Sequence, residues 1–184
     1  MGAALCYALR HMSTPAPDTS LLSADPLRVL FVCLGNICRS PAAEILFCAA
    51  LQRERLSECV LSDSCGTGGW HIGQKPDRRM LAALERHGYA WGGHRARQFS
   101  RADFGKFDLI IPQDDSNRED ILSLARTAEE RAKVVPMAHW FPQGSPFREV
   151  PDPYWDGDRG FDTVVELLES ACCRLAKEIA AARA

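Results

Sequence analysis

The sequence predicts an α/β fold: a three-layer, doubly wound, four-stranded parallel sheet with helices on both faces. Short, continuous apolar runs, which are typical of strands buried on both faces of a parallel sheet, alternate along the chain with longer segments of helical periodicity. The 184 residues, of which 46% are hydrophobic and 25% charged, suit one compact domain with a sizeable core. We expect this domain at residues 27–184, after a disordered tail at residues 1–26 that is rich in Ser, Thr, Pro and Ala.

The first apolar run predicts a strand at Leu27–Cys33. A helix follows it, beginning at Ser40, a candidate N-cap, with Pro41 at the first helical position, and ending at Arg55. By the same reasoning we expect strands at 59–65, 107–113 and 132–138, and helices at 76–88, 114–125 and 161–184. Strands and helices that alternate in this way are joined by right-handed crossovers, and such sheets bind ligands beyond the carboxyl ends of their strands.

The charge and the hydropathy of the chain exclude two classes of partner. The net charge is −2 and the pI is near 6.2, so the composition offers no positive surface for a phosphate backbone and we expect no nucleic-acid partner. No apolar stretch approaches the roughly 18 to 20 residues that cross a bilayer, so we expect no membrane partner. The expected partner is a small or proteinaceous substrate, and we favour a monomer.

The eight cysteines are unevenly spread and show no C-x2-C spacing. This pattern fits reduced thiols in the cytoplasm better than a disulfide framework or a structural zinc site. We therefore expect a cytoplasmic protein with no metal and no organic cofactor.

The segment CLGNICRS joins the first strand to the first helix and places Cys33 six residues before Arg39. A helix N-terminus and inward-facing loop amides form a cup for an anion, which suits both a thiolate and a phosphate. The same surroundings favour the thiolate form of a cysteine, so we expect Cys33 to be nucleophilic. Arg39 offers a planar fork for two oxygens of a tetrahedral oxyanion. The alternative, that Cys33 merely ends a buried strand, leaves the other loop residues unexplained.

The other loop residues have candidate roles of their own. Gly35 permits a left-handed turn, and Asn36 tolerates the same conformation and can brace the loop. Ser40 either donates a hydrogen bond to the Cys33 sulfur or caps the helix. Cys38 is either a small core thiol or close enough to Cys33 for a reversible disulfide under peroxide. We expect the phosphate-binding loop to comprise Leu34, Gly35, Asn36, Ile37, Cys38 and Ser40.

From Leu27 onward the chain resembles the low-molecular-weight protein tyrosine phosphatases, whose loop reads C-x-G-N-x-C-R-S-P. Four further stretches are similar to the same family: DSCGTGGWHIGQKPDRR, HRARQ, FDLIIPQDDSN and DPYW. The resemblance implies hydrolysis of phosphotyrosine through a phosphocysteine intermediate on Cys33, with Arg39 binding the phosphoryl group. It also implies that Asp152 is the general acid and base, whereas we take its neighbours Asp156 and Asp158 as turn residues.

The resemblance also assigns supporting residues. Trp70 and Tyr154 match positions that flank the entrance, where flat rings can enclose a phenyl group. His94 and Asp114 match a hydrogen-bonding pair that braces Asn36 or the loop backbone. Because relatives commonly have a Met where this chain reads IPQDD, Asp115 is an alternative to Asp114.

The sequence also bears on three other functions. A protein-arginine phosphatase on the same fold tends to have threonine where this chain has Ile37. Arsenate reduction needs a further cysteine pair near the middle of the chain, and no cysteine lies between Cys65 and Cys172. A non-catalytic phosphoprotein-binding module would lack an essential group, whereas the nucleophile, the arginine and the acid are all present.

Overall fold

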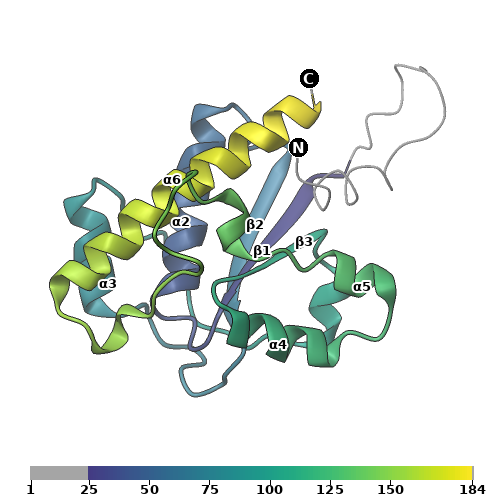
Figure 1. The fold of residues 1–184 in the computed structure, drawn as a ribbon, viewed down its shortest axis with the longest axis horizontal. Coiled ribbons are helices and arrows are strands. Elements are labelled where there is room, and N and C mark those ends of the chain that lie inside the picture. Colours follow the sequence, from purple (N-terminus) through teal and green to yellow (C-terminus); the bar gives the residue numbers. More distant parts are fainter. Residues whose placement is uncertain (1–24, 184) are drawn as a thin grey trace.

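A computed structural model describes residues 25–183, so most of the expected tail at 1–26 lies outside the described residues. Its sheet has three parallel strands in the order β2-β1-β3. They are β1 (Leu27–Cys33), β2 (Val60–Gly66) and β3 (Leu109–Pro112). Leu27 pairs with Val60 on one side of β1, and Val29 pairs with Leu109 on the other. The strand that ends in Cys33 is therefore central (Figure 1).

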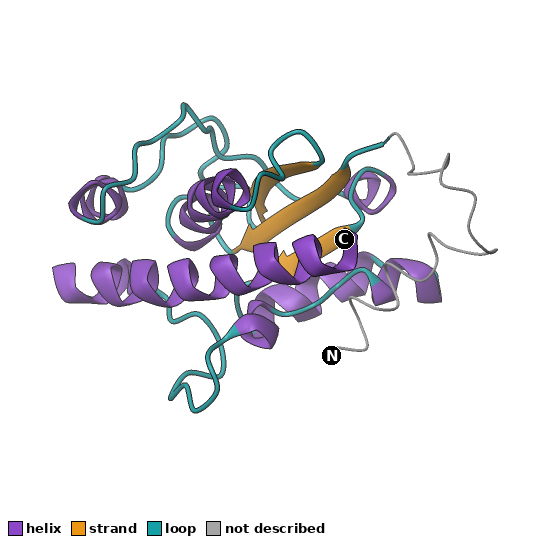
Figure 2. Ribbon diagram, turned by 90° about the horizontal axis from the view of Figure 1, so that it is seen from above, coloured by secondary structure: helices purple, strands orange, loops and turns teal. Residues whose placement is uncertain are grey.

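Helices follow the strands as expected and surround them (Figure 2). The α-helices are α2 (Arg39–Arg53), α3 (Arg78–Arg86), α4 (Asp115–Leu124), α5 (Ala128–Ala132) and α6 (Asp158–Arg183). Short 3₁₀ helices are η1 (Arg101–Gly105), η2 (Met137–Trp140) and η3 (Pro153–Trp155). The long α6 lies against α2 (Figure 1).

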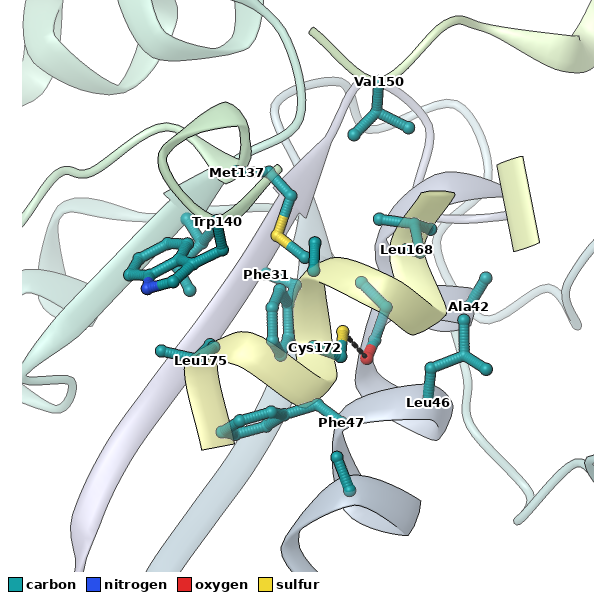
Figure 3. Close-up of a cluster of buried hydrophobic side chains, with 14 of the residues drawn as sticks. Phe31, Ala42, Leu46, Phe47, Met137, Trp140, Val150, Leu168, Cys172 and Leu175 are labelled. Carbon is teal, nitrogen blue, oxygen red and sulfur yellow. Dashed lines mark hydrogen bonds between the residues drawn. The ribbon is translucent and has the colours of Figure 1, made fainter. Parts of the chain in front are cut away.

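Alternate residues of β1 face two separate cores, because successive side chains of a strand point to opposite sides of its sheet. Val29 and Phe31 pack among residues of α2, α3 and α6, and Leu30 and Val32 pack with Ile121 of α4. In the larger core Phe31 meets Phe47 edge to face, with 5.4 Å between ring centroids. Figure 3 shows the same core with Cys172 inside it, its thiol directed at the carbonyl of Ala43. Burial raises the pKa of Cys172 well above its usual value, so it remains a packing residue rather than a reactive thiol.

The α/β fold class is confirmed, but the count of four strands is wrong for the described residues. The expected strand at 132–138 contributes only a parallel bridge between Val134 and Ile110. Its extended part is short because α5, which we did not expect, ends at Ala132 and η2 begins at Met137. Pro136, between them, has no N–H to continue the ladder.

Several helix limits also differ. Helix α2 begins at Arg39, one residue before the expected Ser40. Helix α3 begins at Arg78 because the Asp77 side chain accepts a hydrogen bond from the backbone N–H of Arg79 and so caps the helix. Helix α6 begins at Asp158, three residues earlier than expected. Among the described helices, none combines the length and the apolar character that a bilayer crossing requires.

Candidate active site

The cysteine loop, residues 34–38, connects β1 to α2 and holds Cys33 at the N-terminus of a helix of 15 residues. Cys33 is 3% exposed. Its Sγ lies 3.0 Å from Ser40 Oγ and accepts a hydrogen bond from the backbone N–H of Asn36 at 3.3 Å. Ser40 is thus the second residue of α2, and its hydroxyl faces the sulfur rather than capping the helix. The sulfur therefore lies at the positive end of a helix, within hydrogen-bonding distance of a backbone N–H and a hydroxyl.

Asn36 is the only residue of the loop with a positive φ, 55°. We expected Gly35 to supply this left-handed turn, and that expectation is wrong, because Asn36 tolerates the conformation itself. At Gly35 space is limited but not closed: a Cβ there would lie 3.0 Å from the His71 ring, a side chain that can shift by a few tenths of an ångström. Gly66, at the end of β2, is the glycine that space requires, since its Cβ would lie 2.6 Å from the backbone carbonyl oxygen of Leu34.

The Asn36 side chain is fully buried and all of its hydrogen-bonding groups have partners. Its Nδ2 donates to Ser40 Oγ at 2.9 Å and to Ser64 Oγ at 3.0 Å. Its Oδ1 accepts from His94 Nε2 at 3.1 Å and from the backbone N–H of Arg97 at 2.9 Å. A satisfied buried amide of this kind fixes the loop to β2 and to the segment around His94.

Two residues of this network, Ser64 and Glu44, were missed by the sequence analysis. Ser64 Oγ donates to Glu44 Oε2 at 2.7 Å, and the same carboxylate oxygen lies 3.3 Å from His94 Nδ1. The available signal was a serine within the otherwise buried end of β2, next to the expected loop. Glu44, Asp63 and His94 also bring ligand atoms within 4.8 Å of one another. All three already have protein partners, since Arg97 binds Asp63 at 2.8 Å.

Arg39 is 3% exposed and holds three acceptors around the mouth of the loop. Its Nη1 donates to Asp114 Oδ2 and to the carbonyl of Val150 at 3.3 Å, and its Nη2 donates to Asp152 Oδ2 at 3.1 Å. Burial by itself would lower the pKa of Arg39, but the negative charges of Cys33, Asp152 and Asp114 outweigh it and raise the pKa. The guanidinium is therefore fixed and charged beside the sulfur.

The candidate acids take different positions. Asp152 precedes η3 in the acid loop, residues 150–156, and its carboxylate reaches the Arg39 side of the site while the side chain stays 44% exposed. Asp156 and Asp158 are exposed, at the end of η3 and the start of α6. Asp114 binds Arg39 and caps α4 through the N–H of Asn117 at 2.6 Å, so it does not brace Asn36. Asp115, the alternative, is exposed.

A pocket of about 240 Å³ opens over Cys33. Its walls bring together the aromatic pair expected from the sequence, Trp70 and Tyr154, and a third ring, Trp155, which the sequence analysis missed. Trp155 is 90% exposed, and its ring meets that of Tyr154 nearly perpendicularly at 5.1 Å. The remaining lining comes from His71, from Asp152 of the acid loop, from Cys33 and Arg39, and from four residues of the cysteine loop, namely Leu34, Gly35, Ile37 and Cys38. The geometry suits a flat apolar group carrying a dianion at its inner end.

Cys38 lies beside the nucleophile but in a different electrostatic setting. It is 5% exposed and lines the same pocket. Burial raises the pKa of its thiol strongly, and the charges of Asp77, Cys33 and Asp152 raise it further. Cys38 is therefore protonated at neutral pH. Cys33, in contrast, accepts a hydrogen bond from the Asn36 N–H, and its sulfur lies 3.0 Å from the Ser40 hydroxyl.

Comparison with known proteins assigns this chain to one family. The family described as low molecular weight phosphotyrosine protein phosphatase matches residues 28–184. A low molecular weight protein-tyrosine-phosphatase of Streptomyces coelicolor is 42% identical over 145 residues, covering 78% of this chain and 88% of its own. The human low molecular weight phosphotyrosine protein phosphatase is 40% identical over 147 residues, covering 79% of this chain and 90% of its own.

A solved structure shows the same likeness in three dimensions. The crystal structure of a protein tyrosine phosphatase from Entamoeba histolytica aligns with a TM-score of 0.81 at 35% sequence identity, covering 86% of this chain and 99% of that one. Fold, loop sequence and length of match point to a single group of enzymes. This chain belongs to the low molecular weight phosphotyrosine protein phosphatase family.

Proposed function

We propose that this protein hydrolyses phosphotyrosine in polypeptides through a phosphocysteine intermediate. In the first step the Cys33 thiolate attacks phosphorus and forms an S–P bond. The bond from phosphorus to the phenolic oxygen breaks, and Asp152, as a carboxylic acid, gives its proton to that oxygen. In the second step Asp152, now a carboxylate, takes a proton from the water that attacks phosphorus. The S–P bond breaks, and inorganic phosphate and the thiolate are released.

One observation carries this proposal: Cys33 Sγ accepts a hydrogen bond from the Asn36 backbone N–H and lies 3.0 Å from the Ser40 hydroxyl, which is the donor to the sulfur whenever the sulfur is a thiolate. Both groups lie near the start of α2, beside the buried Arg39. These donors are preorganised, so they stabilise the sulfur as an anion without reorganisation during the reaction. The guanidinium supplies two parallel N–H groups to the equatorial oxygens of the phosphoryl group in both steps. Negative charge on the sulfur and on the phosphoryl oxygens is thereby stabilised by the same loop and helix end.

The entrance supports an aromatic phosphoester within a polypeptide as the substrate. Trp70 and Tyr154 line the pocket over the sulfur, where aromatic side chains suit a phenyl group. Of six large apolar side chains that are exposed within residues 25–183, three line this pocket, namely Leu34, Trp70 and Trp155. A fourth, Ile72, follows Trp70 by two residues. Such a concentration of exposed apolar surface is typical of an interaction site, and here it suits residues next to the phosphotyrosine.

The test is turnover of matched peptides carrying phosphotyrosine, phosphoserine or phosphoarginine by the full chain and by Cys33→Ser. We expect turnover of the phosphotyrosine peptide, its loss in Cys33→Ser with retained phosphate binding, and transient labelling of Cys33 by radioactive phosphate. The matched control is Cys48→Ser, since Cys48 is an exposed thiol outside the pocket. Appreciable turnover by Cys33→Ser, or faster hydrolysis of phosphoarginine, would contradict the proposal.

A further inference from the structure

Arg79, the second residue of α3, connects two loops of the site without lining the pocket. Its guanidinium makes a two-pronged contact with Asp77, through Nε at 3.1 Å and Nη2 at 2.9 Å. Its third nitrogen, Nη1, donates to the backbone carbonyl of Tyr154 at 3.0 Å. The guanidinium carbon also lies 5.3 Å from the centre of the Tyr154 ring and 4.7 Å from that of Phe161 in α6. One side chain thus joins the start of α3 to the acid loop and to α6.

The other side of this connection reaches the cysteine loop. The backbone N–H of Asp77 donates to the carbonyl of Ile37 at 2.7 Å. On the acid-loop side, the backbone N–H of Tyr154 donates to Asp152 Oδ1 at 3.2 Å. A continuous series of contacts therefore runs from Ile37 through Asp77 and Arg79 to Tyr154 and then to Asp152.

We propose that Arg79 is a positioning residue that holds the acid loop in register with the cysteine loop, and so sets where the proton on Asp152 is delivered. This inference rests on the proposed phosphatase function. Arg79 does not line the pocket, so it acts through Tyr154, whose carbonyl and ring it holds, and through Asp152, which the Tyr154 N–H contacts. Proton transfer demands hydrogen-bond distance to the leaving oxygen, so a shift of about 1 Å in the acid loop is costly.

The geometry requires arginine rather than any cation. The planar guanidinium donates hydrogen bonds to Asp77 and to the Tyr154 carbonyl at the same time. It also lies over two aromatic rings, those of Tyr154 and Phe161. Lysine offers a single ammonium and cannot keep all of these contacts. The Asp77 side chain is only 14% exposed, and its carboxylate forms an ion pair with Arg79.

The test compares Arg79→Ala and Arg79→Lys with Arg78→Ala, a neighbouring exposed arginine of the same helix. Substrates are aryl phosphates with poor and good leaving groups. For a poor leaving group we expect both Arg79 variants to lose about 10- to 100-fold in kcat, the size of a misplaced catalytic group, and for a good leaving group to lose several-fold less. Arg78→Ala should match the wild type with both. Equal losses with both substrates, or full rescue by Arg79→Lys, would overturn the inference.

A double-variant cycle separates positioning from general destabilisation. In an Asp152→Ala background, adding Arg79→Lys should cause no further loss that depends on the leaving group, because the group it positions is already absent. A fully additive loss would overturn the inference. Thermal unfolding of each variant checks folding, and Arg79→Lys carries the same test if Arg79→Ala does not fold. Failure of the phosphatase proposal is distinct, since wild-type turnover would then not depend on Cys33.

Discussion

Asn36 Oδ1 accepts a hydrogen bond from His94 Nε2 at 3.1 Å, which links the cysteine loop to a segment 58 residues further along the chain. Asn36 is at once the left-handed residue of the loop and the centre of its side-chain network. The backbone conformation of the cysteine loop and the hydrogen bonds that hold the loop in place therefore both depend on Asn36. Substitutions at this position can separate the two contributions.

Replacing Asn36 by glycine keeps the left-handed backbone and removes the side-chain hydrogen bonds. We expect Asn36→Gly to lower the free energy of unfolding by about 1–3 kcal/mol, the range for leaving buried partners unsatisfied, and to lower kcat/KM. Asn36→Ala should lose about 1 kcal/mol more because its Cβ disfavours the left-handed conformation. Urea unfolding and turnover of an aryl phosphate measure both quantities. Wild-type kcat/KM in Asn36→Gly would show that the network does not support catalysis.

Asp152→Ala removes the proposed proton donor. We expect kcat to fall by about 10²- to 10⁴-fold for a poor leaving group, the usual contribution of general acid catalysis, and by much less for a good one that leaves without a proton. Asp156→Ala, in the same loop and also exposed to solvent, is the matched control and should match the wild type. The measurement is kcat across a series of aryl phosphates, and a loss that is independent of the leaving group would exclude Asp152 as the acid.

Asp114→Asn tests the carboxylate that holds Arg39. Asparagine keeps the cap on α4, because its side-chain oxygen still accepts from the N–H of Asn117. It removes the charge that pairs with the buried guanidinium, so we expect the helix to persist while kcat/KM falls about 10- to 100-fold through a misplaced arginine. Asp115→Asn is the control, since Asp115 is exposed and adjacent. The reverse ranking of the two variants would assign the supporting carboxylate to Asp115.

Mild peroxide should join Cys33 to Cys38. Peroxide oxidises the Cys33 thiolate to a sulfenic acid, and the Cys38 sulfur then displaces water to form the disulfide. Because the pKa of Cys38 is raised by burial and by nearby negative charge, the second step should accelerate as pH rises. Cys38→Ser should lose activity irreversibly, whereas the wild type recovers with a thiol reductant. Mass spectra that contain only sulfinic or sulfonic Cys33 in the wild type would contradict this prediction.

The pair between Asp77 and Arg79 predicts a pH dependence of stability. Hydrogen bonds from Arg79 hold the pKa of Asp77 below its ordinary value of 3.8. A carboxyl group whose pKa is lower in the folded state stabilises the fold above the unfolded value, and that stabilisation disappears as pH falls through the folded value. Asp77→Asn should therefore be less stable than the wild type at pH 7, and the difference should shrink below about pH 4. Urea unfolding at pH 7 and pH 3 measures it, and a constant difference would exclude this linkage.

Local patterns predicted much of the fold. The apolar run at Leu27–Cys33 and the Pro-started segment after it became β1 and α2, and the final amphipathic segment became α6. The prediction of a fourth strand at 132–138 was wrong, because only Val134 of that segment forms a bridge to β3. The apolar run by itself does not indicate how many of its residues will pair. Pairing depends on the neighbouring strand, which the run itself does not contain.

The loop residues and their spacing were determined by the sequence, since Cys33, Asn36, Arg39 and Ser40 lie within one strand–loop–helix junction whose geometry is local. Their partners were decided by the tertiary structure alone. Ser64, Asp114 and Arg79 lie on other segments of the chain, and they reach the junction because parallel strands end at the same edge of the sheet. Hydrogen bonds act over about 3 Å, so contacts between segments distant in sequence exist only once the packed sheet and helices bring them within that range.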